Sequence, residues 1–227
     1  MACPDPDWPA TAARFLTELD AHNTRDWFQA NKQRHAHDVA DPGKRCLEAL
    51  RLAFGALRER PVSGRIFRIA RDMRFARDAA PYHPWLRMAF HSDGEAPGYY
   101  LSIEPAQVRF GVGCLGFDAG QLTAWRTGLI ADEGAPLERE IRHLRSDGWR
   151  LEPPELKRLP HGFSADLPRA DWLRYRQLTL WRDAPPSDFG CREALQAWCL
   201  GAATSATGLS DWLANALPTA DARRNAP

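Results

Sequence analysis

The segment Arg65-Ile-Phe-Arg-Ile-Ala-Arg-Asp-Met-Arg-Phe-Ala-Arg-Asp78 decides the fold, because here the hydrophobic period of the chain changes from 3.6 residues to 2. Apolar side chains recur at odd positions from Phe67, and charged or small ones recur at even positions from Arg68. Neighbouring side chains of a strand point to opposite faces, so the alternation predicts an extended segment with one core face and one charged face. Arg71 interrupts the alternation, and we expect a bulge near it.

Helical periodicity precedes this segment over the first 60 residues. Residues 9–20 and 46–57 are predicted to be amphipathic helices, and Pro61 is expected to close the second of them. Asn23 is the expected N-cap of a further helix between the two. Asp41-Pro42-Gly43 is expected to end that helix.

Alternating and helical segments follow the deciding segment. Strands are predicted at 86–90, 99–103, 108–112, 149–151 and 173–181, and helices from Asp118, over 137–144 and within 187–217. Neighbouring strands are joined by short turns, which favours hairpins. The predicted fold is therefore a single α+β domain over residues 9–217, with N-terminal helices, a central antiparallel sheet of hairpins and C-terminal helices. Residues 1–8 and 218–227 are predicted to be flexible termini.

The charge balance argues against a broad surface for polyanions. The chain has 30 Lys plus Arg and 29 Asp plus Glu, a formal net charge of +1, so nucleic acid is not an expected partner. Residues 64–91 nevertheless hold six arginines and only two aspartates. The overall neutrality conceals a local cationic band, which favours a focused site for an anion.

No apolar run approaches the length of a membrane span, and the N-terminus does not resemble a signal peptide. We therefore expect a cytoplasmic protein without a membrane partner. The five cysteines are odd in number and scattered, so buried free thiols are expected rather than a disulfide framework or a zinc site. The sequence indicates no oligomeric state.

Two motifs have residues that cofactor or metal sites use, and neither is expected to hold such a group. Gly111-Val-Gly113-Cys-Leu-Gly116 matches a dinucleotide-binding pattern, but the strands before it are antiparallel hairpins, so we expect the glycines to serve a tight strand-to-helix turn. His35 and His37 point to different faces of a helix, which predicts a solvated polar face rather than a metal site.

The charged face of the deciding segment is the first candidate site. Its arginines and aspartates could be solvated or form cross-strand ion pairs, each worth about 0–1 kcal/mol. They could also line a pocket in which carboxylates orient the guanidinium groups toward an anionic ligand. A second candidate is the aperiodic stretch that contains Lys157, Arg158 and the Gly162-Phe163 pair, although basic residues at a helix end would explain it equally well.

Motifs in both candidate sites, together with others along the chain, resemble a widespread, mainly bacterial conserved family of unknown function. The motifs, in order over roughly residues 14–215, are Asn23-x-Arg25-Asp26-Trp27-Phe28, Ile66-Phe67-Arg68-x3-Asp72-x-Arg74-Phe75-x2-Asp78-x2-Pro81-Tyr82, Gly98-Tyr99-Tyr100, Gly111-x-Gly113 and Leu156-Lys157-Arg158-x-Pro160-x-Gly162-Phe163-x2-Asp166. The resemblance implies a single α+β domain without an established activity, substrate or cofactor. The chain departs from the usual pattern at several positions, where hydroxyl or basic side chains are more common: Ala76, Ala79, Ala80, His83 and Leu167. These departures argue against chemistry that uses a serine nucleophile or a lysine base.

The predicted function is the binding of an anionic or phosphorylated small molecule in a pocket, either for binding alone or for catalysis. Asp72 and Asp78 are the candidate catalytic residues. The alternatives are a non-enzymatic protein-interaction module that uses exposed tryptophans and arginines and, less favoured, a nucleic-acid binder. No metal and no cofactor is part of the predicted site. The predicted ligand-binding residues are Arg68, Arg71, Asp72, Arg74, Asp78, Tyr82, Lys157 and Arg158.

Overall fold

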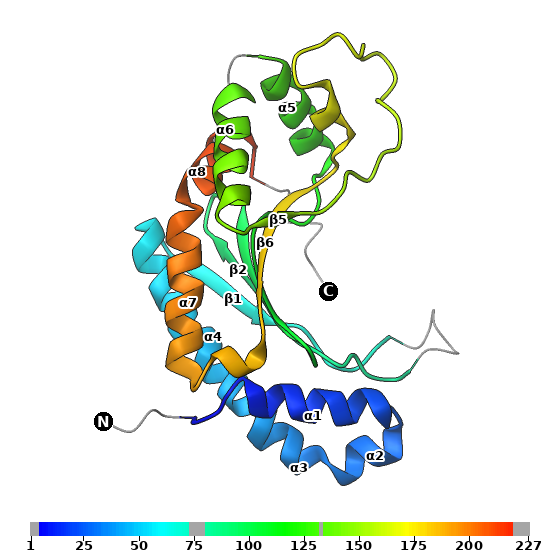
Figure 1. Ribbon diagram of the computed structural model, residues 1–227, viewed down its shortest axis with the longest axis vertical. Coiled ribbons are helices and arrows are strands. Elements are labelled where there is room, and N and C mark those ends of the chain that lie inside the picture. The colour runs from blue at the N-terminus through cyan, green and yellow to red at the C-terminus, as the bar shows by residue number, and fades with distance from the viewer. Residues whose placement is uncertain (1–4, 73–79, 132–133, 220–227) are drawn as a thin grey trace. The chain divides into compact units, whose positions relative to one another are not determined.

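The computed structural model describes residues 5–72, 80–131 and 134–219 and has an α+β architecture (Figure 1). Its six strands form one antiparallel sheet in the order β1-β2-β3-β4-β6-β5, and helices occur at both ends of the chain. The predicted fold class is therefore confirmed. The strands are β1 (Val62–Ile66), β2 (Leu86–Ser92), β3 (Gly98–Ile103), β4 (Val108–Cys114), β5 (Arg150–Leu151) and β6 (Leu178–Ala184).

The helices of the described part cluster before β1, between β4 and β5, and after β6, and one 3-10 turn, η2, lies between β5 and β6. They are α1 (Ala10–Ala21), α2 (Arg25–Ala30), α3 (Lys32–His35), the π-helical turn η1 (Ala36–Ala40), α4 (Asp41–Arg58), α5 (Ala119–Ile130), α6 (Gly134–Ser146), the 3-10 turns η2 (Ala170–Arg174) and η3 (Pro186–Asp188), α7 (Arg192–Ser205) and α8 (Thr207–Ala216). Within the described residues, no helix combines the length and the hydropathy that crossing a membrane requires.

The chain divides into two compact units, and each has its own core. The first unit comprises residues 1–90, 100–110 and 183–202, and the second comprises residues 91–99, 111–182 and 203–227. Strands β2, β3, β4 and β6 each contribute residues to both units. A single domain with the boundaries 9–217 stays a prediction.

A stripe on α4 forms the core of the first unit. Cys46, Leu50 and Phe54 recur at helical spacing and are fully buried. The Phe54 ring packs edge-on against Phe90 of β2, with ring centroids 5.1 Å apart. Each such side chain contributes about 1.5–3 kcal/mol through burial.

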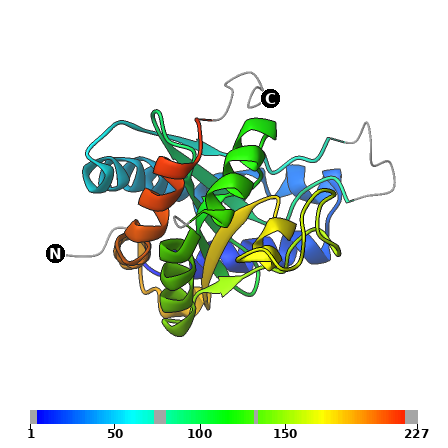
Figure 2. The same cartoon turned by 90° about the horizontal axis from the view of Figure 1, so that it is seen from above.

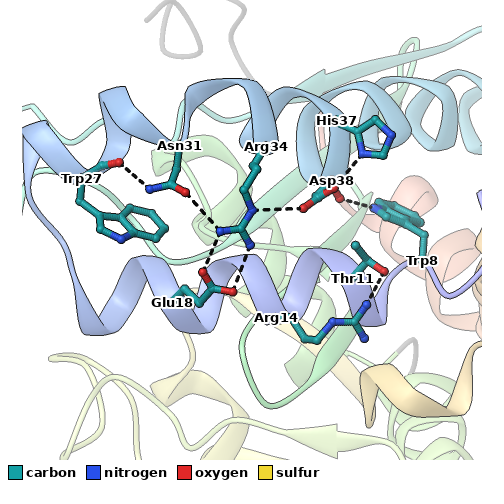
Figure 3. Close-up of polar contacts among 9 residues, drawn as sticks. All are labelled: Trp8, Thr11, Arg14, Glu18, Trp27, Asn31, Arg34, His37 and Asp38. Atoms are coloured by element: carbon teal, nitrogen blue, oxygen red, sulfur yellow. Dashed lines mark hydrogen bonds and ion pairs between the residues drawn. The ribbon is translucent and has the colours of Figure 1, made fainter.

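Arg34 of α3 ties the N-terminal helices together (Figure 3). Its guanidinium donates to both carboxylate oxygens of Glu18 on α1, at 2.8 and 3.0 Å, and to Oδ1 of Asn31 at 3.2 Å. The same guanidinium lies over the ring of Phe15, 5.5 Å from its centroid. The bidentate geometry fixes the orientation of α3 on α1 within the first unit.

The prediction that Asp41-Pro42-Gly43 ends a helix is wrong, because α4 begins at Asp41 directly after η1. Pro42 lies in the first turn of α4 and has no N–H for the Asp38 carbonyl four residues earlier, which accepts from the Trp8 indole N–H instead. Gly43 faces β2, and a Cβ there would lie 3.0 Å from Cδ2 of Leu86. Both residues therefore serve close packing of the helix rather than its termination.

The N-terminal residues 5–8 pack on the first unit, ahead of the boundary expected at residue 9. Trp8 is buried, and its indole N–H donates to the carbonyl of Asp38 at 3.1 Å. Pro6 forms a β-bridge with Cys191.

Cys191 is disulfide-bonded, so the expectation of free thiols throughout is wrong for it. The other cysteines of the described residues, Cys46, Cys114 and Cys199, are free and buried as expected.

Aromatic packing between helices forms the core of the second unit. Trp125 of α5 is fully buried and meets Trp212 of α8 edge-on, with centroids 5.9 Å apart. Leu137 and Ile141 bury the adjacent face of α6, and Figure 2 shows α5, α6 and α8 from above. Asp118 and Gln121 cap α5 reciprocally, and the helix begins directly after Asp118, where the sequence predicts it.

Candidate functional site

The first candidate segment is extended beyond β1 and pairs with the chain that leads into β2. Phe67 N donates to the carbonyl of Arg87 at 2.9 Å, Arg71 N to that of Pro81 at 2.8 Å, and His83 N to that of Ile69 at 2.7 Å. The exposure of residues 67–72 alternates as predicted, with odd positions half-buried and even positions exposed. The regular strand nevertheless ends at Ile66, because only single bridges continue the ladder.

Tyr82 is held in this ladder by the N-terminal helices of the same unit. The amide of Asn23 donates to the Tyr82 carbonyl at 2.9 Å and accepts from the Tyr82 N–H at 3.0 Å. The Tyr82 ring is buried and stacks on Phe28, with centroids 4.1 Å apart. The prediction that Asn23 caps α2 is therefore wrong. Thr24 caps this helix, because its hydroxyl accepts from the N–H of Trp27.

Two positive side chains flank His83 in the first unit. Its ring stacks on Trp85 at 4.4 Å, and the Arg87 guanidinium lies over Trp85 at 4.4 Å from the ring centroid. Burial lowers the pKa of His83, and the charges of Arg71 and Arg87 lower the pKa further. The local field is thus positive, although Arg87 also pairs with Glu104 at 3.4 Å.

The remaining predicted residues of this segment are distributed unevenly. Arg68 and Asp72 are exposed and Arg71 is half-buried. Arg71 Nε donates to the Tyr82 carbonyl at 3.5 Å. Arg74 and Asp78 lie outside the described residues.

The second candidate segment, residues 155–169 of the second unit, is a loop anchored at both ends beside α5 (Figure 2). At its start, the Glu155 carboxylate accepts from the Arg176 backbone N–H at 2.7 Å. At its end, Arg169 donates to the carbonyls of Leu129 and Ala131, at 2.7 and 2.6 Å, and so completes the C-terminus of α5. Lys157 and Arg158 lie between these anchors and are exposed.

Arg126 of α5 lies beside this loop, with its guanidinium 5.8 Å from the ring centroid of Phe163. Its Nε is buried and has no hydrogen-bond partner within the described residues. Burial lowers the pKa of Arg126, and the charge of Arg176 lowers it further. Within the described residues no ion pair joins a carboxylate to either guanidinium, and the acid at this place, Glu155, binds the backbone N–H of Arg176.

Arg126 and Arg176 were not among the residues predicted from sequence. One signal was present, because Arg126 is the one charged residue of α5. A lone charge on an apolar helix usually points to solvent, and nothing in the sequence places it near Arg176. Whether the arginines of the first unit act with Lys157 and Arg158 stays a prediction.

The glycine motif serves close packing within β4 of the second unit, and the prediction of a strand-to-helix turn is wrong for its first two members. A Cβ on Gly111 would lie 2.5 Å from the Trp181 ring. Gly113 has a φ of +138°, and a Cβ there would lie 2.0 Å from the carbonyl oxygen of Leu178. The glycines therefore let β6 approach the strand.

Two further expectations concern metals and exposed aromatic residues. Within the described residues, no group of three or more His, Cys, Asp or Glu could hold a metal ion. His35 packs instead between Phe15 and Phe28, at 5.6 and 5.1 Å, and burial lowers its pKa. All nine tryptophans are described and none is exposed. The interaction-module alternative therefore lacks the exposed tryptophans on which it was based.

The comparisons with known proteins give a family without an activity. A family model described as a conserved hypothetical protein (DUF2461) matches residues 11–212. No curated protein matches the chain.

Proposed function

This chain belongs to the DUF2461 family of conserved hypothetical proteins, and we propose that it binds an anionic small molecule at a cationic site of its second unit. Arg126 and Arg176 form the centre of the site, and Lys157 and Arg158 of the adjacent loop extend it. The observation that carries the proposal is the buried Nε of Arg126, an unsatisfied donor on a cation whose pKa is lowered by the charge of a second cation, Arg176.

An unpaired buried donor on a charged group costs free energy, and a second like charge adds to the cost. An anion between the two guanidinium groups removes both penalties, because each guanidinium can donate two parallel hydrogen bonds to oxygen atoms. A phosphate or carboxylate has this geometry. The ring of Phe163 beside Arg126 limits access of water to one side of the guanidinium.

The first unit supplies a separate set of proposed ligand-binding residues. Arg68 and Arg71, with Arg74, would bind negative charge, and the positive field at His83 supports this role. Asp72 and Asp78 are proposed to orient these arginines or to act as a general base. Tyr82 holds a structural position, since its ring is buried on Phe28 and its backbone is bound by Asn23.

Thermal unfolding in phosphate, pyrophosphate and a panel of phosphorylated metabolites tests the proposed site in the second unit. A ligand at ten times its Kd adds about 1.4 kcal/mol of stability, which raises the Tm of a chain of this size by about 3–6 °C. In Arg126→Met the apolar stem remains beside Phe163 but the charge is lost. We expect this variant to keep the Tm of the unliganded wild type, or to exceed it, and to lose the ligand-dependent rise.

Arg139→Met is the matched control, because Arg139 is an exposed arginine on α6 of the same unit. It should show the full rise in Tm. An equal rise in wild type and in Arg126→Met, or no response of the wild type to any anion in the panel, would reject the site. An Arg126→Met protein that unfolds without ligand would assign the arginine a structural role instead.

A further inference from the structure

A hollow of about 360 Å³ on the second unit lies apart from the residues proposed above. It has the volume of a small-molecule site. One face of α6 forms most of its lining, at the spacing i, i+3, i+4 and i+7. The lining residues are Glu138, Ile141, Arg142, Arg145 and Ser146 of α6 and Trp172 of η2.

The aromatic wall of the hollow is rigid. The Trp172 ring stacks on Tyr175, with centroids 5.3 Å apart and ring planes inclined by 29°. The Trp172 carbonyl accepts from the indole N–H of the buried Trp125 at 3.2 Å, which ties η2 to α5. Trp172 is half-buried and Ile141 is buried, so an apolar surface of fixed shape borders the hollow.

The charged part of the lining holds two arginines and one acid, and Glu138 lies one helical turn before Arg142. Within the described residues, neither Arg142 nor Arg145 takes part in an ion pair. The charge of Arg145 also opposes the rise in the pKa of Tyr175 that burial causes. Glu138 lies seven residues before Arg145, about 10 Å along the helix axis. The hollow is therefore positive toward the C-terminal end of α6 and negative toward the other end.

We propose that this hollow binds a small aryl monoanion, such as an aromatic carboxylate. The aromatic ring packs against Trp172 and Ile141, and the carboxylate binds Arg142 and Arg145. Glu138 repels a second negative charge, so a dianion such as inorganic phosphate is disfavoured. The site differs in this selectivity from the centre at Arg126, where neither guanidinium forms an ion pair within the described residues and no carboxylate lines the proposed anion position.

Isothermal titration with indole-3-acetate, neutral indole and inorganic phosphate tests the proposal on the full chain. The wild type should bind indole-3-acetate more tightly than indole, and Arg126→Met, which lacks the other proposed anion site, should not bind phosphate. Loss of both arginines in Arg142→Ala/Arg145→Ala should weaken indole-3-acetate by roughly tenfold or more, the equivalent of one charge-assisted hydrogen bond. Trp172 and the residues of α6 should show the largest NMR shift changes on binding.

Two further variants separate this site from others. Arg139→Ala removes an exposed arginine of α6 that does not line the hollow, and it should leave the Kd unchanged. Arg126→Met should also leave the Kd for indole-3-acetate unchanged, so the two sites can fail independently. Glu138→Gln should tighten the binding of phenyl phosphate. The proposal is overturned if the double arginine variant binds as tightly as wild type, or if neutral indole binds as tightly as the acid.

Discussion

Asn23→Ala is expected to destabilise the first unit more than the loss of a polar loop side chain usually does. The amide makes two hydrogen bonds to the backbone of Tyr82, at 2.9 and 3.0 Å, across 59 positions of the chain. Each bond contributes about 0.5–1.5 kcal/mol net, so the loss of both costs about 1–3 kcal/mol. For a chain of this size, a central value of about 2 kcal/mol lowers the Tm by about 4–8 °C.

Urea unfolding followed by circular dichroism measures this loss, with two comparison variants. Asn23→Asp keeps the acceptor for the Tyr82 N–H but turns a carboxylate oxygen toward the Tyr82 carbonyl, so its loss of stability should be at least as large. Asn31→Ala removes an amide whose bonds, to the Trp27 carbonyl and from Arg34, stay within the α1–α3 region, and it should cost less than Asn23→Ala. If Asn23→Ala costs under about 0.5 kcal/mol, the joining of these two segments through Asn23 is refuted.

Three further predictions concern packing, pH and a helix end. Gly113→Ala should lower the free energy of unfolding in urea by more than about 3 kcal/mol, because its Cβ would lie 2.0 Å from the Leu178 carbonyl oxygen on a strained backbone. Gly116→Ala is the control and should be nearly neutral, because no atom lies within 4 Å of its Cβ. Equal losses of stability in the two variants would contradict this prediction. Burial lowers the pKa of His35, so the folded state binds fewer protons than the unfolded state below pH 6.5, and its stability should fall with decreasing pH by at most about 1.4 kcal/mol per pH unit. In His35→Leu, the free energy of unfolding in urea should depend less on pH between 6.5 and 5. An unchanged pH dependence in this variant would refute the prediction. Arg169→Ala frees two carbonyls at the end of α5 and should speed amide exchange there, whereas unaltered exchange would argue against the cap.

The sheet and most helices could be predicted because their periods are local. Alternation over residues 67–72 places odd side chains toward the interior, and the capping pair Asp118 and Gln121 starts α5 where expected. The strand predicted at 173–181 was misplaced, since η2 covers its first residues and β6 runs from Leu178 to Ala184. An Asp171–Arg174 ion pair and the Trp172–Tyr175 stack accompany the tight turn there.

The errors at Asn23 and Gly111 share one cause, which is a partner that lies far along the chain. Asn23 and Thr24 can both cap a helix, and only the position of Tyr82 shows which one does. The sequence predicts that Gly111 lies in a turn, whereas the structure shows it in a strand with the Trp181 ring packed against it.

The candidate site was only partly predictable for the same reason. Lys157 and Arg158 could be found from their motif, and the structure places both on the exposed loop beside α5. Arg126 and Arg176 could not, because nothing in the sequence shows that the charge of one acts on the other. A sequence shows which cations are present, but it does not show which of them lack a carboxylate.

The central claim, an anion bound at Arg126 and Arg176, is tested most directly by soaking a crystal of the protein in selenate and locating the selenium by its anomalous scattering. We predict a peak with selenate oxygens within hydrogen-bond distance of both guanidinium groups, and no such peak in Arg126→Met. A wild-type crystal whose selenate lies only on exposed arginines elsewhere would contradict the claim.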